Sequence, residues 1–295
     1  MNTRFELRSL VLLAWAALVP LLADAQSAGS AQALLAQHRQ LAPQLENNVF
    51  GRPLALQSRE ASDQLAGDIH AVIDHRFDEV SSALKQPGIW CEILMLHLNT
   101  KHCAVEQSGS ASTVAVAVGR KFDQPLSDAQ RIDFAYRVNA ASADYLEVRL
   151  DAAQGPMSTR NYRIVLEATP LDGGHTFIHL GYAYAYGTAA RLAMKGYLAT
   201  MGSDKVGFTT TGKTAGGPAD YIGGIRGVVE RNTMRYYLAI DAYLDLPGAA
   251  QRDKRLVQWF DGTESYARQL HEVDRGEYLQ MKRSEFKRMQ EGGTP

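Results

Sequence analysis

The feature that most constrains the fold is a run of period-two segments between residues 103 and 186. Apolar and polar residues alternate along each segment, and Gly, Asp, Asn, Ser or Pro separates one segment from the next. Such alternation is typical of antiparallel strands that turn back on one another. It predicts six consecutive strands: Cys103 to Gln107, Thr113 to Lys121, Ile132 to Asn139, Tyr145 to Ala152, Asn161 to Thr169 and Thr176 to Tyr186.

The same alternation predicts one dry and one wet face of the sheet. Charged side chains such as Asp133, Arg149 and Glu167 share one face, which we expect to meet water. The residues of the other face are bulky and apolar or aromatic, and they include Phe134, Tyr136, Val148, Leu166, Ile178, Leu180, Tyr182 and Tyr184. Because an apolar face of this length is unfavourable in water, we expect another element to pack against it.

Residues 220 to 244 are predicted to form a helix that covers the dry face. Apolar residues recur there every three or four positions, which places them on one stripe of a helix. The stripe includes Ile225, Val229, Tyr236 and Ile240. Asp220 is the expected N-cap, and Pro247-Gly248 ends the helix.

Upstream of the meander the sequence predicts a helix over residues 31–46 and extended stretches at Leu54 to Ser58 and Asp68 to Asp74. Two short helices are expected next, over about 76–85 and 89–98, with Pro87-Gly88 between them. The element order is therefore one or two strands, two short helices, a long meander and a long helix, which is an α+β arrangement.

Between residues 67 and 244 the chain resembles the START-like, or helix-grip, superfamily (SRPBCC), which includes polyketide cyclases and birch-pollen-allergen proteins. The resemblance rests on the element order, on the strand 68–74 leading into residues 77–80 and Trp90, and on the turn at 171–176. It implies a helix-grip fold, in which a bent antiparallel sheet of about seven strands wraps around the long helix. Two short helices would follow the first strand. It also implies an apolar cavity between sheet and helix, which commonly holds a lipid, sterol or polyketide.

Tyrosines on the dry face favour such a cavity on physical grounds. A buried tyrosine hydroxyl needs a hydrogen-bonding partner. Several hydroxyls around an apolar space suit a ligand that is mostly hydrocarbon with one polar end. The alternative is that the tyrosines pack an ordinary core and reach water or backbone at its rim. The residues expected to line the ligand site are the dry-face and helix-stripe residues given above.

The leading functional hypothesis is a binding or carrier protein for a hydrophobic or amphipathic small molecule, a lipid in the first instance. The second is a cyclase or isomerase that works in the same cavity, with His70, Glu92 or Tyr136 as acid or base. The third is a structural or interaction protein with a filled core. No nucleophile-elbow, zinc-protease or dinucleotide-binding motif occurs in the sequence, so we assign no catalytic residue and expect no cofactor.

Two cysteines, Cys91 and Cys103, are expected to form a disulfide, because an even count in an exported chain favours oxidation. The bond would join the second short helix to the first strand of the meander. The alternative is a nucleophilic thiol with His97 or His102 as base. The same histidines lack a third metal-ligating residue at helical spacing, and we therefore expect no metal.

The N-terminal 25 residues have the pattern of a signal peptide. Arg4 and Arg8 precede an apolar run over residues 10–22, and Ala23-Asp24-Ala25 matches a small-x-small cleavage site. The run is short for a membrane span. We expect cleavage after Ala25 and a periplasmic location.

Residues 207–214 match the phosphate-loop pattern G-x-x-x-x-G-K-[ST], which needs a buried strand before it and a helix directly after it. Polar residues 203–205 precede the match and Ala215-Gly216-Gly217-Pro218 follows it, so we expect no nucleotide and interpret the segment as a mobile flap. The formal net charge of -1 and the lack of a long basic run argue against nucleic acid.

Four regions follow from these patterns: a leader at 1–25, an N-terminal helix and extended segment at 26–66, a START-like domain at 67–247, and an amphipathic helical tail at 248–295. The tail either braces the domain's own surface or contacts an anionic membrane or a protein partner. In the second case the contacting residues would be Lys282, Arg283, Lys287 and Arg288.

Overall fold

The computed structural model describes residues 30–61, 63–188, 191, 192, 194, 196, 203–213 and 219–291. The expected signal peptide and its cleavage site lie outside these residues, as does Thr214 of the phosphate-loop match.

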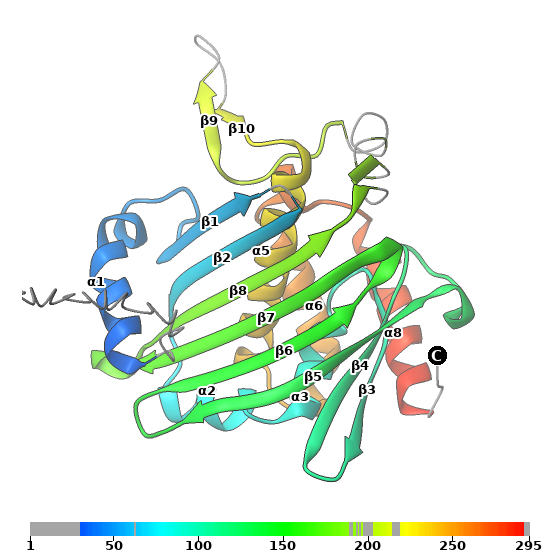
Figure 1. Cartoon of the computed structure of the whole chain (residues 1–295), viewed down its shortest axis with the longest axis horizontal. Helices are drawn as coiled ribbons and strands as arrows, with labels where there is room; N and C mark the ends of the chain where they lie inside the picture. The colour runs from blue at the N-terminus through cyan, green and yellow to red at the C-terminus, as the bar shows by residue number, and fades with distance from the viewer. Residues whose placement is uncertain are drawn as a thin grey trace, which may run out of the picture.

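One large antiparallel sheet organises the described chain (Figure 1), with the strand order β1-β2-β8-β7-β6-β5-β4-β3. The strands are β1 Leu54–Glu60, β2 Gln64–Ile73, β3 Thr100–Ser108, β4 Ala111–Val118, β5 Gln130–Ala141, β6 Leu146–Gln154, β7 Thr159–Pro170 and β8 Thr176–Tyr186. The predicted six-strand meander is confirmed as β3 to β8. The described sheet has eight strands rather than about seven, because β1 pairs with β2 along its whole length. β2 begins at Gln64, so the sheet includes residues before position 67, where the sequence predicts the start of the START-like domain.

The long helix α5 (Gly224–Asp245) contacts β1, β2 and β8, and it crosses behind the strands in Figure 1. We call the sheet face toward α5 the inner face. The predicted N-cap at Asp220 is wrong, because Asp220 lies in β10 (Ala219–Tyr221), which pairs with β9 (Thr210–Lys213). The chain then turns into α5 through Gly224, whose φ of 63° favours glycine and prevents an earlier helical start.

The two short helices follow β2 as predicted, with α2 at Phe77–Leu84 and α3 at Pro87–Leu94. Pro87 separates them by opening α3, since its ring suits the first turn of a helix. Cys91 in α3 and Cys103 in β3 form a disulfide with a Cα–Cα distance of 5.3 Å, which confirms the predicted bond. A nucleophilic thiol at these positions is thereby contradicted.

The outer face of the sheet is not wholly wet, contrary to the prediction. Helix α1 (Ala31–Glu46) packs on it and buries Leu34, Leu41 and Leu45 against Tyr145 and Phe177. The physical reason is that Phe177 in β8 and Tyr145, which directly precedes β6, place large aromatic rings on this face, and the N-terminal helix excludes water from them.

The C-terminal tail forms α6 (Arg252–Glu264), α7 (Ala267–Leu270) and α8 (Arg275–Gln290), which brace α5 and β3. A membrane contact through Lys282 is wrong, because this side chain is fully buried. Its Nζ lies 2.5 Å from a carboxylate oxygen of Glu285, and the other oxygen is 3.0 Å from Nζ of the equally buried Lys101. Within the described ranges, no helix combines the length and the hydropathy that a bilayer span requires.

Candidate functional site

A cavity lies between the inner face of the sheet and the N-terminal half of α5. It has two compartments, an inner one of about 540 Å³ and an outer one of about 660 Å³. Both compartments are lined by Tyr162 and Tyr182 from the sheet, Asn232 from α5 and Met157 from the turn between β6 and β7. Because they share these walls, we treat them as one site.

Five of the twelve residues predicted to line a ligand site are on the cavity wall. They are Phe134, Tyr182, Tyr184, Ile225 and Tyr236. The other seven lie in the closely packed core and line neither compartment: Tyr136, Val148, Leu166, Ile178, Leu180, Val229 and Ile240.

The register explains this division. Val148, Leu166 and Leu180 form one row across three neighbouring strands, and all three are 0% exposed. The neighbouring row contains Ile164 and Tyr182, and it lines the cavity. It lies two positions closer to the start of β7 and to the end of β8, which are side by side in the antiparallel sheet. Alternation therefore predicts the correct face, but it does not show where along the strands the helix stands away from the sheet.

Four tyrosine rings form a continuous aromatic wall. The ring centroids of Tyr162 and Tyr184 are 5.2 Å apart, and those of Tyr182 and Tyr236 are 5.3 Å apart. The Tyr162 hydroxyl hydrogen-bonds with Thr159 at 2.8 Å, whereas the hydroxyls of Tyr182, Tyr184 and Tyr236 make no hydrogen bond to any described residue. Burial raises the pKa of these three hydroxyls, which keeps them neutral. They are polar groups on a largely aromatic wall and can each hydrogen-bond to a bound molecule.

His97 adds a neutral polar group to the wall of the inner compartment. Its ring stacks on Tyr236 with centroids 5.0 Å apart, and its Nδ1 accepts the backbone N–H of Asn99 at 3.1 Å. Burial, together with the charges of Arg235 and Lys282, holds the pKa of His97 well below its ordinary value. The proton of the neutral ring therefore belongs on Nε2, which has no well-aligned acceptor among the described residues.

The outer compartment ends in a group of charged side chains. Glu272, which precedes α8, binds Nζ of Lys121 at 2.6 Å, Nζ of Lys205 at 3.1 Å and the guanidinium of Arg235 at 2.9 Å. Burial alone would raise the pKa of Glu272, but Arg235 and Lys121 outweigh it and hold the pKa at about 2. Sequence reasoning missed this group, because its members come from four separate segments and no spacing pattern connects them.

The mouth of the outer compartment carries two exposed apolar side chains, Phe122 at 57% and Met157 at 63%. Met157 and Ser158 in this turn have positive φ, as does Asn161 in the first residues of β7. Such conformations persist where the surrounding structure imposes them, and they are frequent at ligand sites. The turn therefore fixes an apolar side chain at the entrance.

None of the three acid or base candidates is on the cavity wall. Tyr136 donates to the carbonyl of Leu84, and Glu92 binds Arg252 and Arg255. His70 lies on the outer face, with its ring stacked 4.4 Å from that of His179. In the described part of the chain, no group of three His, Cys, Asp or Glu side chains is arranged to hold a metal.

His179 is held between two carboxylates, 2.9 Å from Asp68 and 2.7 Å from Glu167. Burial by itself would lower the pKa of His179, but the two carboxylates outweigh it and raise the pKa to about 9. In contrast, burial and the neighbouring charge of His179 lower the pKa of His70 to about 4. The outer face thus contains one charged and one neutral imidazole in contact.

Among the described residues, the next element after the segment that matches the phosphate-loop pattern is the strand β10. The backbone N–H groups of Phe208 and Thr209 donate to the carboxylate of Glu230 in α5, at 2.6 and 2.9 Å. The chain then enters β9, which pairs with β10. Amides that would hold a phosphate in a true loop here hold a carboxylate of the protein itself.

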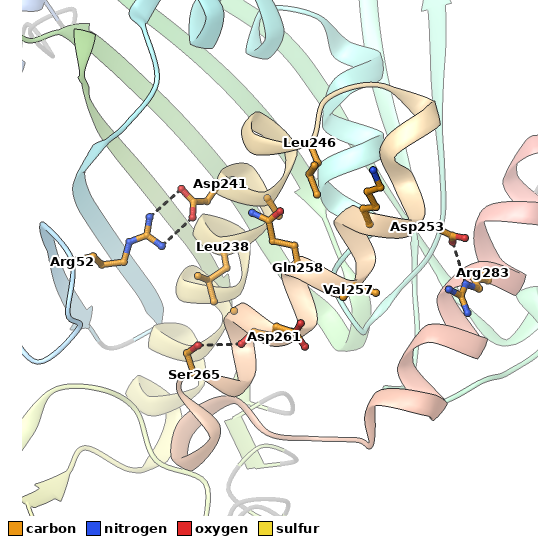
Figure 2. Close-up of a pocket in the computed structure, with 13 residues that line it drawn as sticks. Arg52, Leu238, Asp241, Leu246, Asp253, Val257, Gln258, Asp261, Ser265 and Arg283 are labelled. Atoms are coloured by element: carbon orange, nitrogen blue, oxygen red, sulfur yellow. Dashed lines mark hydrogen bonds and ion pairs between the residues drawn. The ribbon is translucent and has the colours of Figure 1, made fainter. Parts of the chain in front are cut away.

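A second depression, of about 680 Å³, lies between α5 and α6 (Figure 2). Figure 2 shows Arg52 paired with Asp241 and Arg283 paired with Asp253, at 3.0 and 3.1 Å. These charged side chains satisfy one another in an open groove. The cavity beside the tyrosines is less open than this groove and is therefore the better candidate for a ligand site.

No family model matches the sequence, and no curated protein matches it. Solved structures similar to this chain include human StAR-related lipid transfer protein 5, with 10% identity, 57% of this chain and 88% of that chain covered, and a TM-score of 0.32. A protein from Arthrobacter aurescens has 12% identity, coverage of 66% and 94%, and a TM-score of 0.34. CalU16 from Micromonospora echinospora has 12% identity, coverage of 74% and 98%, and a TM-score of 0.30.

The chain's own topology defines its class. A meander of six strands, a β1–β2 hairpin joined to its last strand, two short helices after β2 and a long helix on the inner face constitute a START-like helix-grip fold. The fold implied by the sequence resemblance is confirmed.

Proposed function

We propose that this protein binds, and carries or senses, a hydrophobic or amphipathic small molecule. A lipid is the ligand class that we propose first. The observation that carries the proposal is the aromatic cavity with three tyrosine hydroxyls that lack a partner in the described chain. Each compartment lies within the roughly 300–1,000 Å³ typical of small-molecule sites. A ligand with a hydrocarbon body and a polar end would fill the cavity and satisfy the hydroxyls.

The proposed location is the periplasm, after cleavage of the leader at Ala25. The support is the charged, apolar and small-x-small pattern of residues 4–25. The Cys91–Cys103 disulfide also fits an oxidising compartment, since cytosolic thiols are kept reduced. The intact mass of the exported protein tests both features.

The binding proposal is tested by recovering what the protein carries. The protein is purified after export, and native mass spectrometry is followed by solvent extraction. We expect a copurifying hydrophobic molecule and binding of the neutral apolar dye Nile red. If wild-type protein contains no such molecule and binds no dye, the cavity does not serve a ligand and the structural hypothesis replaces ours.

A matched pair of tryptophan variants places the ligand in the cavity. Ile225 is 8% exposed and lines the outer compartment, so Ile225→Trp should fill space that the dye occupies. Val138 is 40% exposed on β5, so Val138→Trp adds the same ring away from the cavity. We expect at least tenfold weaker dye binding in the first variant and a change of less than about threefold in the second.

An enzyme in the same cavity is the second candidate, and the position of His97 favours it. Because Nδ1 accepts the N–H of Asn99, the neutral ring can use its Nε2–H to donate a hydrogen bond to negative charge that develops on a bound molecule. The test is turnover of the extracted molecule by wild type and by His97→Gln. Loss of turnover with retained binding in the variant would support catalysis, and no turnover by wild type would leave the carrier function.

A further inference from the structure

The outer compartment has a strong excess of positive charge. Among the described residues, five basic side chains line it, together with one acidic side chain, Glu272. The basic residues are Arg120, Lys121, Lys205, Arg231 and Arg235. In a partly enclosed apolar space this imbalance is costly unless an anion enters, since a low dielectric strengthens the repulsion among the cations.

Lys121 is the best placed of these cations to meet a ligand. Its ammonium has three donors, and within the described part of the chain it forms one ion pair, with Glu272 at 2.6 Å. Its side chain is 29% exposed and forms part of the wall. Lys205 is similar, at 27% exposed, and it binds both Glu272 and the carbonyl of His271. Both lysines therefore reach the cavity with N–H donors to spare.

The apolar and cationic parts of the wall are continuous. Tyr182, Tyr184 and Ile225 line the same outer compartment as Lys121 and Lys205. The inner compartment beyond them is lined by Val116, Ile132, Phe134 and Ile164. A molecule lying in this space would therefore have its hydrocarbon part against the sheet and its head beside the lysines.

We propose that the ligand is an anionic amphiphile, whose carboxylate or phosphate head binds Lys121 and Lys205 while its hydrocarbon chain fills the tyrosine-lined cavity. The inference rests on the proposed binding function and narrows the ligand class. Each ammonium would form a charge-assisted hydrogen bond to the head group, and these bonds are stronger than those between neutral groups. Glu272 holds the cations in place without cancelling their charge.

The experiment compares ligands that differ only in head-group charge. The probes are cis-parinaric acid against its methyl ester, followed by fluorescence, and lysophosphatidate against monoacylglycerol as competitors. We expect at least tenfold tighter binding of the anion in one pair. The pair with the larger ratio identifies whether the head is a carboxylate or a phosphate.

Lys121→Met tests the residue, because methionine is unbranched like the apolar stem of lysine and removes the charge. We expect about tenfold weaker binding of the anion and a change of less than about twofold for the neutral partner, with recovery in Lys121→Arg. Lys254→Met, in the groove between α5 and α6, is the matched control and should bind like wild type. Retained binding of the neutral partner shows that the variant is folded.

Two results separate the inference from the proposed function. Equal binding of anion and neutral partner in both pairs, with clear affinity for each, would overturn the anionic ligand and leave the binding function intact. Failure of wild type to bind any of the four probes, or Nile red, would overturn both.

Discussion

Replacement of Glu285 by glutamine should be among the most destabilising single changes in the tail. The Glu285 carboxylate bridges the ammonium groups of Lys101 and Lys282, and all three side chains are 0% exposed. With formal charges of two cations and one anion, the group has a net charge of +1. Glu285→Gln raises it to +2 and leaves two buried ammoniums without a counter-ion.

The magnitude follows from the burial of these charges. Removal of one partner from a buried ion pair costs about 3 to 5 kcal/mol. At about 2 to 4 °C per kcal/mol for a domain of this size, the melting temperature should fall by roughly 6 to 20 °C. With a urea m-value near 3 kcal/mol/M, the unfolding midpoint should fall by about 1 to 2 M.

Urea unfolding followed by far-ultraviolet circular dichroism provides the assay, with two comparison variants. Lys282→Met removes the excess cation and leaves the Lys101–Glu285 pair, so it should cost only about 1 to 2 kcal/mol for the carbonyls that lose a donor. Glu291→Gln changes the same residue type at an exposed pair with Lys287, where we expect less than about 0.5 kcal/mol.

The double variant Lys282→Met/Glu285→Gln completes a thermodynamic cycle. Since it contains one buried ammonium fewer than Glu285→Gln, it should be less destabilised than the sum of the two single variants by about 1 to 3 kcal/mol. Additive single effects, or a cost below about 1 kcal/mol for Glu285→Gln, would refute the claim that one carboxylate neutralises both lysines.

Three further outcomes are expected. His179 has a pKa of about 9 in the folded state and 6.5 in the unfolded state, so its charged form contributes about 3 kcal/mol to the free energy of unfolding near pH 6. This contribution is lost as the pH rises through 9. The difference in urea stability between wild type and His179→Gln should therefore shrink between pH 6 and pH 9. Cys91→Ser should lower the unfolding free energy by about 3 kcal/mol relative to oxidised wild type. Reduced wild type is the control, and the variant should be about as stable as this form. Glu230→Gln should speed hydrogen exchange at the amides of Phe208 and Thr209 at least tenfold, and unchanged exchange would show that the carboxylate does not hold this segment.

The fold was largely predictable because its signals are local. Alternation along each strand and the spacing of the α5 stripe depend on neighbours within one element. Both patterns can therefore be recognised in the sequence without knowledge of the tertiary structure. The predicted helix start at residue 220 is four residues early, because the apolar stripe continues through Ile222 while the backbone turn at Gly224 leaves no signal in hydropathy.

The candidate site was only partly predictable because its limits are set by tertiary distance. Tyr182 and Leu180 share a strand face, yet one lines the cavity and the other is packed in the core. Lys121 and Glu272 meet only after the tail has folded back. Lys282 did carry a local signal that was missed: Glu285 lies three residues on, in a helix whose neighbouring Met281 and Phe286 are buried.

The pairing of β2 with β8 has a consequence for the order of folding. Each strand from β3 to β8 pairs with the next one along the chain, so these hairpins close short loops, whereas Ile69 meets Leu180 only after the whole meander has been made. Closure over a long stretch of chain costs more entropy and is slower. Because α5 follows β8 and rests on β1, β2 and β8, its docking depends on that late closure. We therefore expect sheet signals to recover early in refolding and the enclosed space beside α5 to appear last, so that a ligand enters a nearly finished molecule.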